Sequence, residues 1–368
     1  MTAKPYDQIV YVLQGGGALG SYQVGVCSAL LKHDYTPNWI IGTSIGAVNA
    51  AIIVGNKPED RIPKLFQFWN SITYPTPLLS NIDDDQYIEF TNWMNAQWVT
   101  LFGQPGFFRP RLFNPWFFTK ATPDNLSFYD TAELKHTLQQ VINFDLINDR
   151  HIRLTLAALH VKSGKLARFD NTKQIITADH IMASCALPPG FPAVKIDDEY
   201  FWDGGLSSNT PFTTILEEKI PQKLLCFIVD LFAFPDKLPK SMVDVLKIKK
   251  ELTYVSRHQE VLHYFCELHY QQHLIDELAK KCDLVEDSSI LKDEIKRIAD
   301  IGHPTSLDLV HLVYDNPATD LWSSDYNFAR TSFNSHLKNG YRDAYNALKD
   351  KSWLSAVTDE TGISMHEY

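Results

Sequence analysis

The sequence has no lysine- or arginine-rich run, and 34 basic against 44 acidic residues give a formal net charge of −10. Nucleic-acid binding needs concentrated positive charge opposite the phosphates, so no nucleic-acid partner is expected. The five cysteines form no CxxC pair and have no zinc-like spacing, which favours buried free thiols in a reducing compartment. The N-terminal residues lack the apolar stretch of a signal peptide, and we therefore expect a cytoplasmic location.

A transmembrane helix is also not expected. Residues 35–56 carry no charge and are long enough to cross a bilayer, but proline, glycine and polar residues divide them into two apolar pieces. A buried strand followed by a helix of small residues explains this stretch better. With 45% hydrophobic residues among 368, the chain can bury a large core.

The first part of the chain alternates between strand and helix patterns. Residues 8–13 predict a buried strand, and a glycine loop leads into a helix over about 20–32. Residues 39–44 predict a second strand, and the following helix is expected to end near Gly55. This order is typical of an α/β fold with a mostly parallel central sheet.

The remaining patterns suggest further strands and a helical end. Residues 151–170 predict two strands, 173–186 a strand and a short helix, and 223–234 a buried strand. The pattern turns helical from about 241 to 302, and 307–315 are compatible with a strand. We expect a first domain at residues 8–235 and a mainly helical C-terminal extension at 241–368.

An aromatic-rich insertion at about residues 71–130 is expected to cap the first domain. Thirteen aromatic residues lie between Tyr87 and Tyr129. Most of these rings are expected to pack the cap onto the body. The alternative is that some line an acyl-chain groove or touch a lipid surface, where rings suit a half-wet boundary. The candidates for lipid contact are Phe107, Phe108, Trp116 and Phe117.

A GTSIG motif at residues 42–46 falls between a predicted strand and a predicted helix. Glycines on both sides of a serine permit a strained turn that pushes the hydroxyl out above the sheet. Ser44 is therefore a candidate nucleophile, which needs a neighbouring base to take its proton.

Histidine is the usual base, but none of the thirteen is clearly marked. Four sit on a polar helical stretch and are expected to be solvated: His258, His263, His269 and His273. Two others, His160 and His180, lie in or near predicted strands. An acid is the alternative, and Asp203 follows a short apolar run and precedes two glycines.

The glycine-rich loop at residues 15–20, GGGALG, can be interpreted in two ways. Gly15, Gly17 and Gly20 fit the dinucleotide pattern GxGxxG, which also needs an acid at the end of the next strand. The serine turn stands there instead, so the cofactor interpretation loses most of its support. Backbone N–H groups at a helix N-terminus would instead suit the oxyanion of an acyl-transfer intermediate.

Taken in order, these motifs resemble the patatin-like phospholipase family: GGGALG at 15–20, GTSIG at 42–46 and DGG at 203–205. The block ASCALPPGFPAV at 183–194 is also similar to that family. The resemblance covers about residues 8–235. The remainder is similar to the C-terminal extension that follows the patatin domain in a bacterial subgroup.

The resemblance implies a three-layer α/β/α fold with a mostly parallel central sheet and a helix-rich C-terminal extension. It also implies a Ser-Asp dyad, with Ser44 as nucleophile and Asp203 as general base. The implied oxyanion hole consists of Gly15, Gly16, Gly17 and Ala18. The other motif glycines are Gly20, Gly42, Gly46, Gly204 and Gly205. Many members carry arginine or lysine where this chain has Leu19, and a missing cation there would weaken recognition of a phosphate headgroup.

The expected activity is hydrolysis of carboxylic esters of phospholipids or lysophospholipids through an acyl-enzyme. One alternative is a lipid-binding or scaffold protein whose dyad is silent until a partner or a membrane activates it, and another is a transacylase. No metal or other cofactor is expected. The expected partners are a lipid ester substrate, a membrane touched peripherally, and a protein bound through the C-terminal extension.

Overall fold

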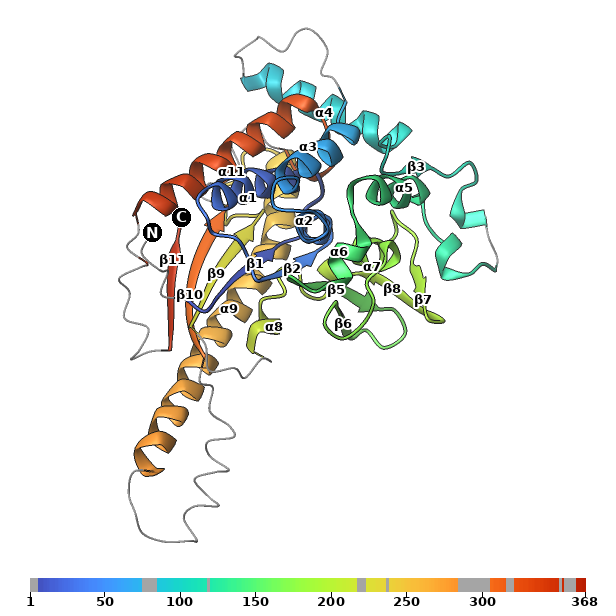
Figure 1. The fold of residues 1–368 in the computed structure, drawn as a ribbon. Helices are drawn as coiled ribbons and strands as arrows, with labels where there is room; N and C mark the ends of the chain where they lie inside the picture. The colour runs from blue at the N-terminus through green and yellow to red at the C-terminus, as the bar shows by residue number, and fades with distance from the viewer. Residues whose placement is uncertain are drawn as a thin grey trace.

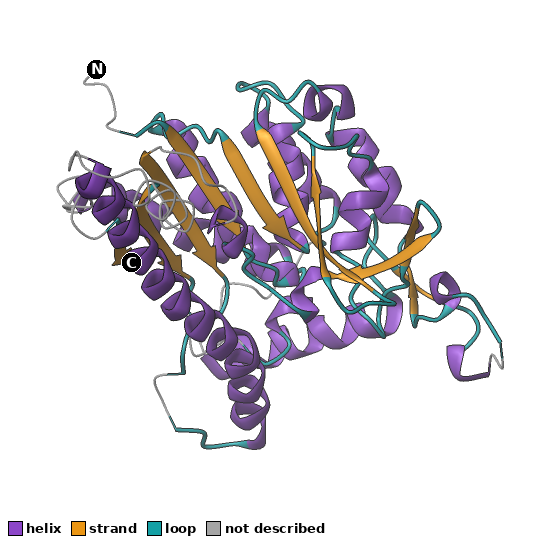
Figure 2. Ribbon diagram, turned by 90° about the horizontal axis from the view of Figure 1, so that it is seen from below, coloured by secondary structure: helices purple, strands orange, loops and turns teal. Residues whose placement is uncertain are grey.

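A computed structural model describes residues 6–74, 85–117, 120–216, 223–235, 238–283, 305–315, 321–350, 353 and 362–368. Its centre is a nine-stranded sheet in the order β11-β10-β9-β1-β2-β5-β8-β7, with β6 pairing β5 (Figures 1 and 2). In chain order the strands are β1 (Gln8–Leu13), β2 (Trp39–Thr43), β5 (Arg153–His160), β6 (Leu166–Asp170), β7 (Val194–Ile196), β8 (Glu199–Asp203), β9 (Lys223–Asp230), β10 (Ser306–Val313) and β11 (Ile363–Glu367).

The sheet is mostly parallel, as predicted. All neighbouring pairs from β11 to β5 are parallel, while β6, β8 and β7 add an antiparallel end. The carboxyl ends of β1 and β2 therefore meet at one edge, with Leu13 opposite Gly42. This edge brings the glycine loop and the serine turn together.

Helices cover both faces of the sheet, which gives the expected three layers (Figure 2). In β1, Tyr11 and Leu13 belong to the apolar core on one face, and Val10 and Val12 to the core on the other. The first face is covered by α1 (Ser21–Lys32), α2 (Ile45–Val54), α3 (Arg61–Ser71), α5 (Ala132–Val141), α6 (Phe144–Asn148), α7 (Ala178–Ser184) and α11 (Arg330–Asp350). The second is covered by α8 (Thr213–Leu216) and α9 (Met242–Asp283).

The C-terminal part of the chain is built into the same sheet. Strand β10 pairs with β9, and β11 extends the sheet beside β10. Helix α11 lies along α1, where the Tyr22 hydroxyl donates a hydrogen bond to Asp343 at 3.2 Å. The sheet is thus continuous across the expected boundary between 235 and 241, and the division into two domains stays a prediction.

The aromatic-rich segment lies outside the main sheet. It consists of α4 (Asp85–Phe102), the short 3-10 helices η2 (Pro115–Phe117) and η3 (Pro123–Asn125), and a ribbon of β3 (Arg109–Pro110) and β4 (Tyr129–Asp130). None of the helices in the described part of the chain has the length and apolar character that a bilayer span needs.

Several expectations about the fold were wrong. Most of the described rings between Phe90 and Phe128 are exposed, which contradicts the expectation that most of them pack the cap onto the body. The strand predicted before α7 is absent, because the Asn148 side chain satisfies the backbone N–H and carbonyl of Ile176 at 2.8 and 3.0 Å. His269 and His273 are buried rather than solvated, because α9 packs them toward the second face of the sheet. His263 is exposed as expected, and the side chain of His258 lies outside the described residues.

Candidate active site

The GTSIG motif forms a sharp turn between β2 and α2, with Ser44 at its apex. Ser44 has φ 54° and ψ −125°, a conformation that costs energy in a non-glycine residue and persists only where the surroundings enforce it. Gly46 packs so closely on the Leu13 backbone at the end of β1 that a side chain would collide. The turn places the Ser44 hydroxyl at the N-terminus of α2, whose dipole favours negative charge there.

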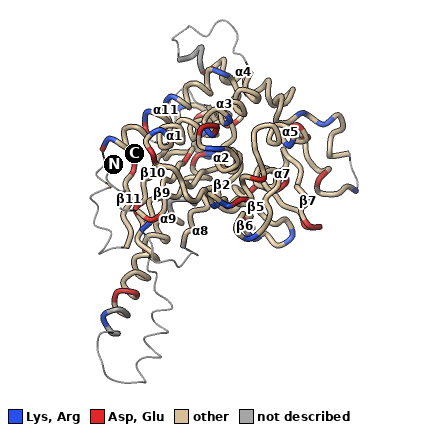
Figure 3. The backbone as a smooth tube through the Cα atoms, in the orientation of Figure 1, with Lys and Arg blue, Asp and Glu red and all other residues tan. Residues whose placement is uncertain are grey.

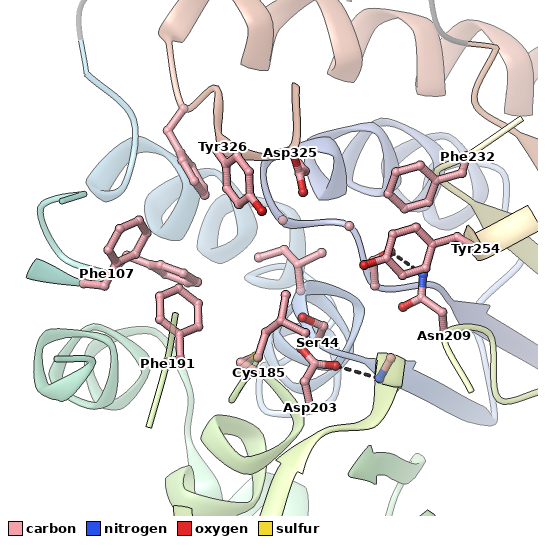
Figure 4. A pocket seen from close by; sticks show the side chains of 18 residues that line it. Ser44, Phe107, Cys185, Phe191, Asp203, Asn209, Phe232, Tyr254, Asp325 and Tyr326 are labelled. Atoms are coloured by element: carbon pink, nitrogen blue, oxygen red, sulfur yellow. Dashed lines mark hydrogen bonds between the residues drawn. The ribbon is translucent and has the colours of Figure 1, made fainter. Parts of the chain in front are cut away.

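Asp203 ends β8 and is the base predicted for Ser44. The Ser44 hydroxyl donates a hydrogen bond to its carboxyl group. The Gly205 N–H donates another at 2.7 Å, which is drawn as a dashed line in Figure 4. Asp203 is 2% exposed, and burial raises its pKa to about 7 against the lowering effect of these two bonds. A carboxyl with this pKa is a better base near neutral pH than a free aspartate of pKa about 3.9.

The glycine loop runs past Ser44 between β1 and α1. A Cβ at Gly15 would lie 2.9 Å from the Ser44 Cβ, so only glycine allows this approach. The Gly15 N–H donates to the Asn209 carbonyl at 3.3 Å, which makes it unavailable as an oxyanion donor, contrary to expectation. Among the described hydrogen bonds, the N–H groups of Gly16, Gly17 and Ala18 have no acceptor, and they are the candidate donors.

Two residues that the sequence analysis did not single out hold this arrangement. The Ser184 hydroxyl accepts the Ser44 N–H at 3.0 Å and donates to the Ala157 carbonyl at 2.6 Å. The Asn209 side chain donates to the Gly15 carbonyl at 2.9 Å. Ser184 lies in the ASCALPPGFPAV block, and Asn209 lies four residues after the DGG motif. Their position in or beside these motifs was the sequence signal that could have identified them.

A cavity of about 80 Å³ opens beside Ser44 and Asp203 (Figure 4). One wall is a cluster of rings from the aromatic-rich segment and the ASCALPPGFPAV block. The Phe107 and Phe191 ring centroids are 5.9 Å apart, and those of Phe108 and Phe191 are 5.0 Å apart. The cavity is therefore narrow and mostly apolar next to the nucleophile.

The C-terminal part supplies further lining residues, and the Phe328 ring contacts Phe107 with centroids 5.8 Å apart. Tyr254 from α9, Asp325 and Tyr326 from η5 (Ser324–Tyr326), and Phe328 line the cavity. Lys250 forms an ion pair with Asp325, and its Nζ lies 4.8 Å from the centre of the Tyr326 ring. The Asp325 carbonyl packs against Gly17, so this part of the chain also holds the glycine loop in place.

The four candidate lipid contacts fall into two groups. Phe107 and Phe108 are each 5% exposed and line the cavity beside Ser44. Trp116 and Phe117 are exposed at the surface and do not line it. The first pair is therefore placed for a bound acyl chain, whereas the second can only meet something outside the protein.

The other predicted positions have simpler roles. Among the described residues that line the cavity there is no histidine; His160 contacts Glu199, and His180 is bonded to Thr177. Leu19 is fully buried in the core, so its position does not face the site.

In the parts of the chain that the structure covers, no group of three or more His, Cys, Asp or Glu is placed to bind a metal. The remaining motif glycines pack closely around the two turns: Gly20, Gly42 and Gly204.

Two family models and several known proteins match this chain. A family model described as patatin-like phospholipase matches residues 11–216, and one described as patatin phospholipase matches residues 252–360. Triacylglycerol lipase 5 of Saccharomyces cerevisiae is 21% identical over 280 residues, which are 70% of this chain and 34% of that protein. Triacylglycerol lipase SDP1L of Arabidopsis thaliana is 30% identical over 74 residues, 20% of this chain and 9% of that protein.

The chain thus matches about a third of the yeast lipase and less than a tenth of the plant one. The uncharacterized protein YqhO of Bacillus subtilis is 24% identical over 213 residues, 56% of this chain and 67% of that protein. Among solved structures, VipD from Legionella pneumophila matches with a TM-score of 0.39 and 14% identity, covering 95% of this chain and 67% of that one.

Proposed function

Because this chain belongs to the patatin-like phospholipase family, we propose that it is a serine lipid acyl hydrolase that cleaves carboxylic esters with a Ser44-Asp203 dyad. One observation carries the proposal. The hydroxyl on the strained turn is hydrogen-bonded to a buried carboxyl group of pKa about 7, beside three backbone N–H groups that have no acceptor within the described residues. Nucleophile, base and oxyanion donors are therefore available in one place.

The proposed reaction has two halves. Ser44 Oγ attacks the ester carbonyl while Asp203 takes its proton, and the oxyanion is held by the N–H groups of Gly16, Gly17 and Ala18. Asp203 then protonates the leaving alcohol oxygen, which leaves an acyl-enzyme. Water gives a proton to Asp203 as it attacks this ester. Asp203 then returns that proton to Ser44 Oγ as the bond to the acyl group breaks, which releases the fatty acid and restores the free enzyme. Loss of one oxyanion donor in such sites typically lowers the rate by about 100- to 1000-fold.

The proposed substrate is a lipid ester whose acyl chain passes between Phe107, Phe108 and Phe191. A cavity of about 80 Å³ is smaller than the roughly 300–1,000 Å³ of ordinary small-molecule sites, so the rings must separate when a lipid enters. The relatives named as triacylglycerol lipases suggest that neutral esters belong in the substrate screen beside phospholipids and lysophospholipids. Leu19 points into the core, so headgroup choice would not depend on it.

The test is fatty-acid release from phospholipid, lysophospholipid and triacylglycerol, measured for the wild type, Ser44→Ala and Asp203→Asn. Ser207→Ala is a matched control, because Ser207 is an exposed serine close to Asp203 in the chain. We expect activity in the wild type and the control and none in the two dyad variants. Equal release by Ser44→Ala would refute the assignment of the nucleophile. Glycerol as an added acceptor separates hydrolysis from transacylation.

The narrow cavity favours one second candidate, a lipid-binding protein whose dyad is silent until the site opens. In that case the folded protein would bind vesicles without turnover until a membrane or a partner is added. Lys250, Asp325 and Tyr326 connect the C-terminal part to the glycine loop, which gives a partner of that part a physical route to the site. Turnover of a soluble ester by the protein alone would exclude this candidate.

A further inference from the structure

One segment of the cap exposes large apolar side chains to solvent. We call residues 109–117 and 120–122 the cap loop. Four of its side chains are almost fully exposed, at 74 to 96%: Leu112, Phe113, Trp116 and Phe117. Single exposed apolar residues are ordinary, but four within six positions form a concentrated patch that water solvates poorly.

The cap loop is also positively charged, although the protein as a whole is acidic. Its charged residues are Arg109, Arg111 and Lys120, and the sequence has no acidic residue from position 90 to 123. These three cations line a groove of about 750 Å³, together with Leu112 and Phe113. In Figure 3 the backbone of this part of the chain carries blue Lys and Arg positions and projects from the body on the side away from the two termini.

Only some of this charge is used within the protein. The Arg111 side chain donates to the Ser127 hydroxyl at 3.0 Å and the Asp124 carbonyl at 3.1 Å, so it has a structural role. Arg109 lies 3.9 Å from Asp130 across the β3-β4 ribbon and keeps 61% of its side chain exposed. Lys120 is exposed. Arg109 and Lys120 are therefore the cations that can meet an external anion.

The cap loop is joined firmly to the wall of the active-site cavity. Phe108 lines the cavity and Arg109, the next residue, begins the loop. Six residues beyond its far end, the N–H groups of Phe128 and Tyr129 donate to the carbonyls of Pro189 and Gly190 at 3.1 and 2.9 Å. Phe191, which follows, is again part of the cavity wall. The segment that carries the cap loop is therefore continuous with one side of the cavity wall and hydrogen-bonded beside another part of it.

We propose that the cap loop is a docking surface for an anionic lipid bilayer. Aromatic and leucine side chains enter the boundary between headgroups and acyl chains, while Arg109 and Lys120 contact lipid phosphates. Distant acidic residues weaken this attraction little, because charges separated by more than about 10 Å are screened at 0.1 M salt. The proposal rests on the proposed function, because the bilayer that the cap loop binds would contain the lipid ester that the enzyme cleaves.

The test uses the full chain with Ser44→Ala, so that binding is measured without hydrolysis of the vesicles. Flotation compares phosphatidylcholine vesicles with vesicles that also contain phosphatidylglycerol. Arg109→Gln with Lys120→Gln removes two charges, and at about fivefold each we expect roughly 25-fold weaker binding to the anionic vesicles at low salt. Lys162→Gln with Lys165→Gln, two exposed lysines elsewhere, is the matched control and should change binding little.

The apolar contribution is tested by Trp116→Ser with Phe117→Ser, which should weaken binding to both kinds of vesicle. Absence of binding to anionic vesicles would overturn the proposal, as would an equal loss in the control pair. Retained binding by both cap-loop variants would place the membrane-docking surface elsewhere on the chain and overturn the proposal.

Failure of the proposed function gives a different pattern. With Ser44 intact, both cap-loop variants should hydrolyse a soluble short-chain ester at the wild-type rate, because neither pair lines the cavity. A wild type that binds vesicles but never hydrolyses the soluble ester contradicts the hydrolase alone. A wild type that hydrolyses the ester but does not bind vesicles contradicts the docking surface alone.

Discussion

The ionisation of Asp203 should control the pH dependence of catalysis. The base must be ionised to accept the Ser44 proton, and burial raises its pKa to about 7. Activity should therefore fall as pH drops below 7. About one-tenth of the free enzyme carries the ionised base at pH 6 and about nine-tenths at pH 8, so kcat/KM should differ roughly tenfold between them.

The assay is kcat/KM for a soluble short-chain ester between pH 5 and 9, with the released acid measured by chromatography so that no ionising dye disturbs the reading. A limb of the pH profile near neutral pH is usually assigned to histidine, so His160→Asn and His180→Asn are measured in parallel. The limb should stay near pH 7 in both. Its disappearance in a folded histidine variant would argue for a triad, and a limb near pH 4 would refute the effect of burial.

A substitution beside the carboxyl group moves the limb if the reasoning is right. Cys185 is buried, lines the cavity, and interacts electrostatically with Asp203. A hydroxyl at this position stabilises the ionised carboxyl group better than a methyl group does, so Cys185→Ser should show the limb at lower pH than Cys185→Ala. Identical limbs in the two variants would mean that another group titrates.

Three further predictions concern the same site. Asp203→Asn should unfold at a higher temperature than the wild type at pH 8. Because folding raises the pKa of Asp203, the free energy of unfolding of the wild type falls by up to about 4 kcal/mol as pH rises from about 4 to 7. Calorimetry should show that the advantage of the variant vanishes toward pH 4. Gly15→Ala should lower kcat at least 100-fold on a soluble ester, because its Cβ would lie 2.5 Å from the Asn209 side-chain oxygen and 2.9 Å from the nucleophile's Cβ; a rate within tenfold of wild type would contradict the close approach. Lys250→Met should lower kcat more than it changes KM, because its ion pair with Asp325 holds the glycine loop; an unchanged kcat would separate the C-terminal part from catalysis.

The turn at Ser44 could be predicted from the sequence because its signals are local. A serine between glycines after an apolar strand requires a particular backbone turn, and Ser44 has the conformation that such a turn needs. The succession of strand and helix from β1 to α2 followed from the same short patterns. Asp203 became a candidate base because its DGG motif resembles that of the patatin-like family, and its role as the base stays a prediction.

Features that depend on distant parts of the chain could not be predicted in this way. The Gly15 N–H is occupied by Asn209, almost two hundred residues away, so only the fold shows which donors are free. On α9, the 3- and 4-residue spacing of Leu262, Phe265, His269 and His273 was a core pattern that the surrounding charges obscured. The role of Lys250 could not be predicted from the sequence either, because it depends on the position of η5 in the fold.

The most direct test of the central claim is covalent labelling by a fluorophosphonate probe, read by intact mass, for the wild type, Ser44→Ala and Asp203→Asn. The account predicts one added probe on the wild type and none on either variant, because labelling needs both the Ser44 oxygen and the buried base that activates it. Labelling of folded Ser44→Ala at the wild-type rate, or of Asp203→Asn as fast as wild type, would contradict the dyad.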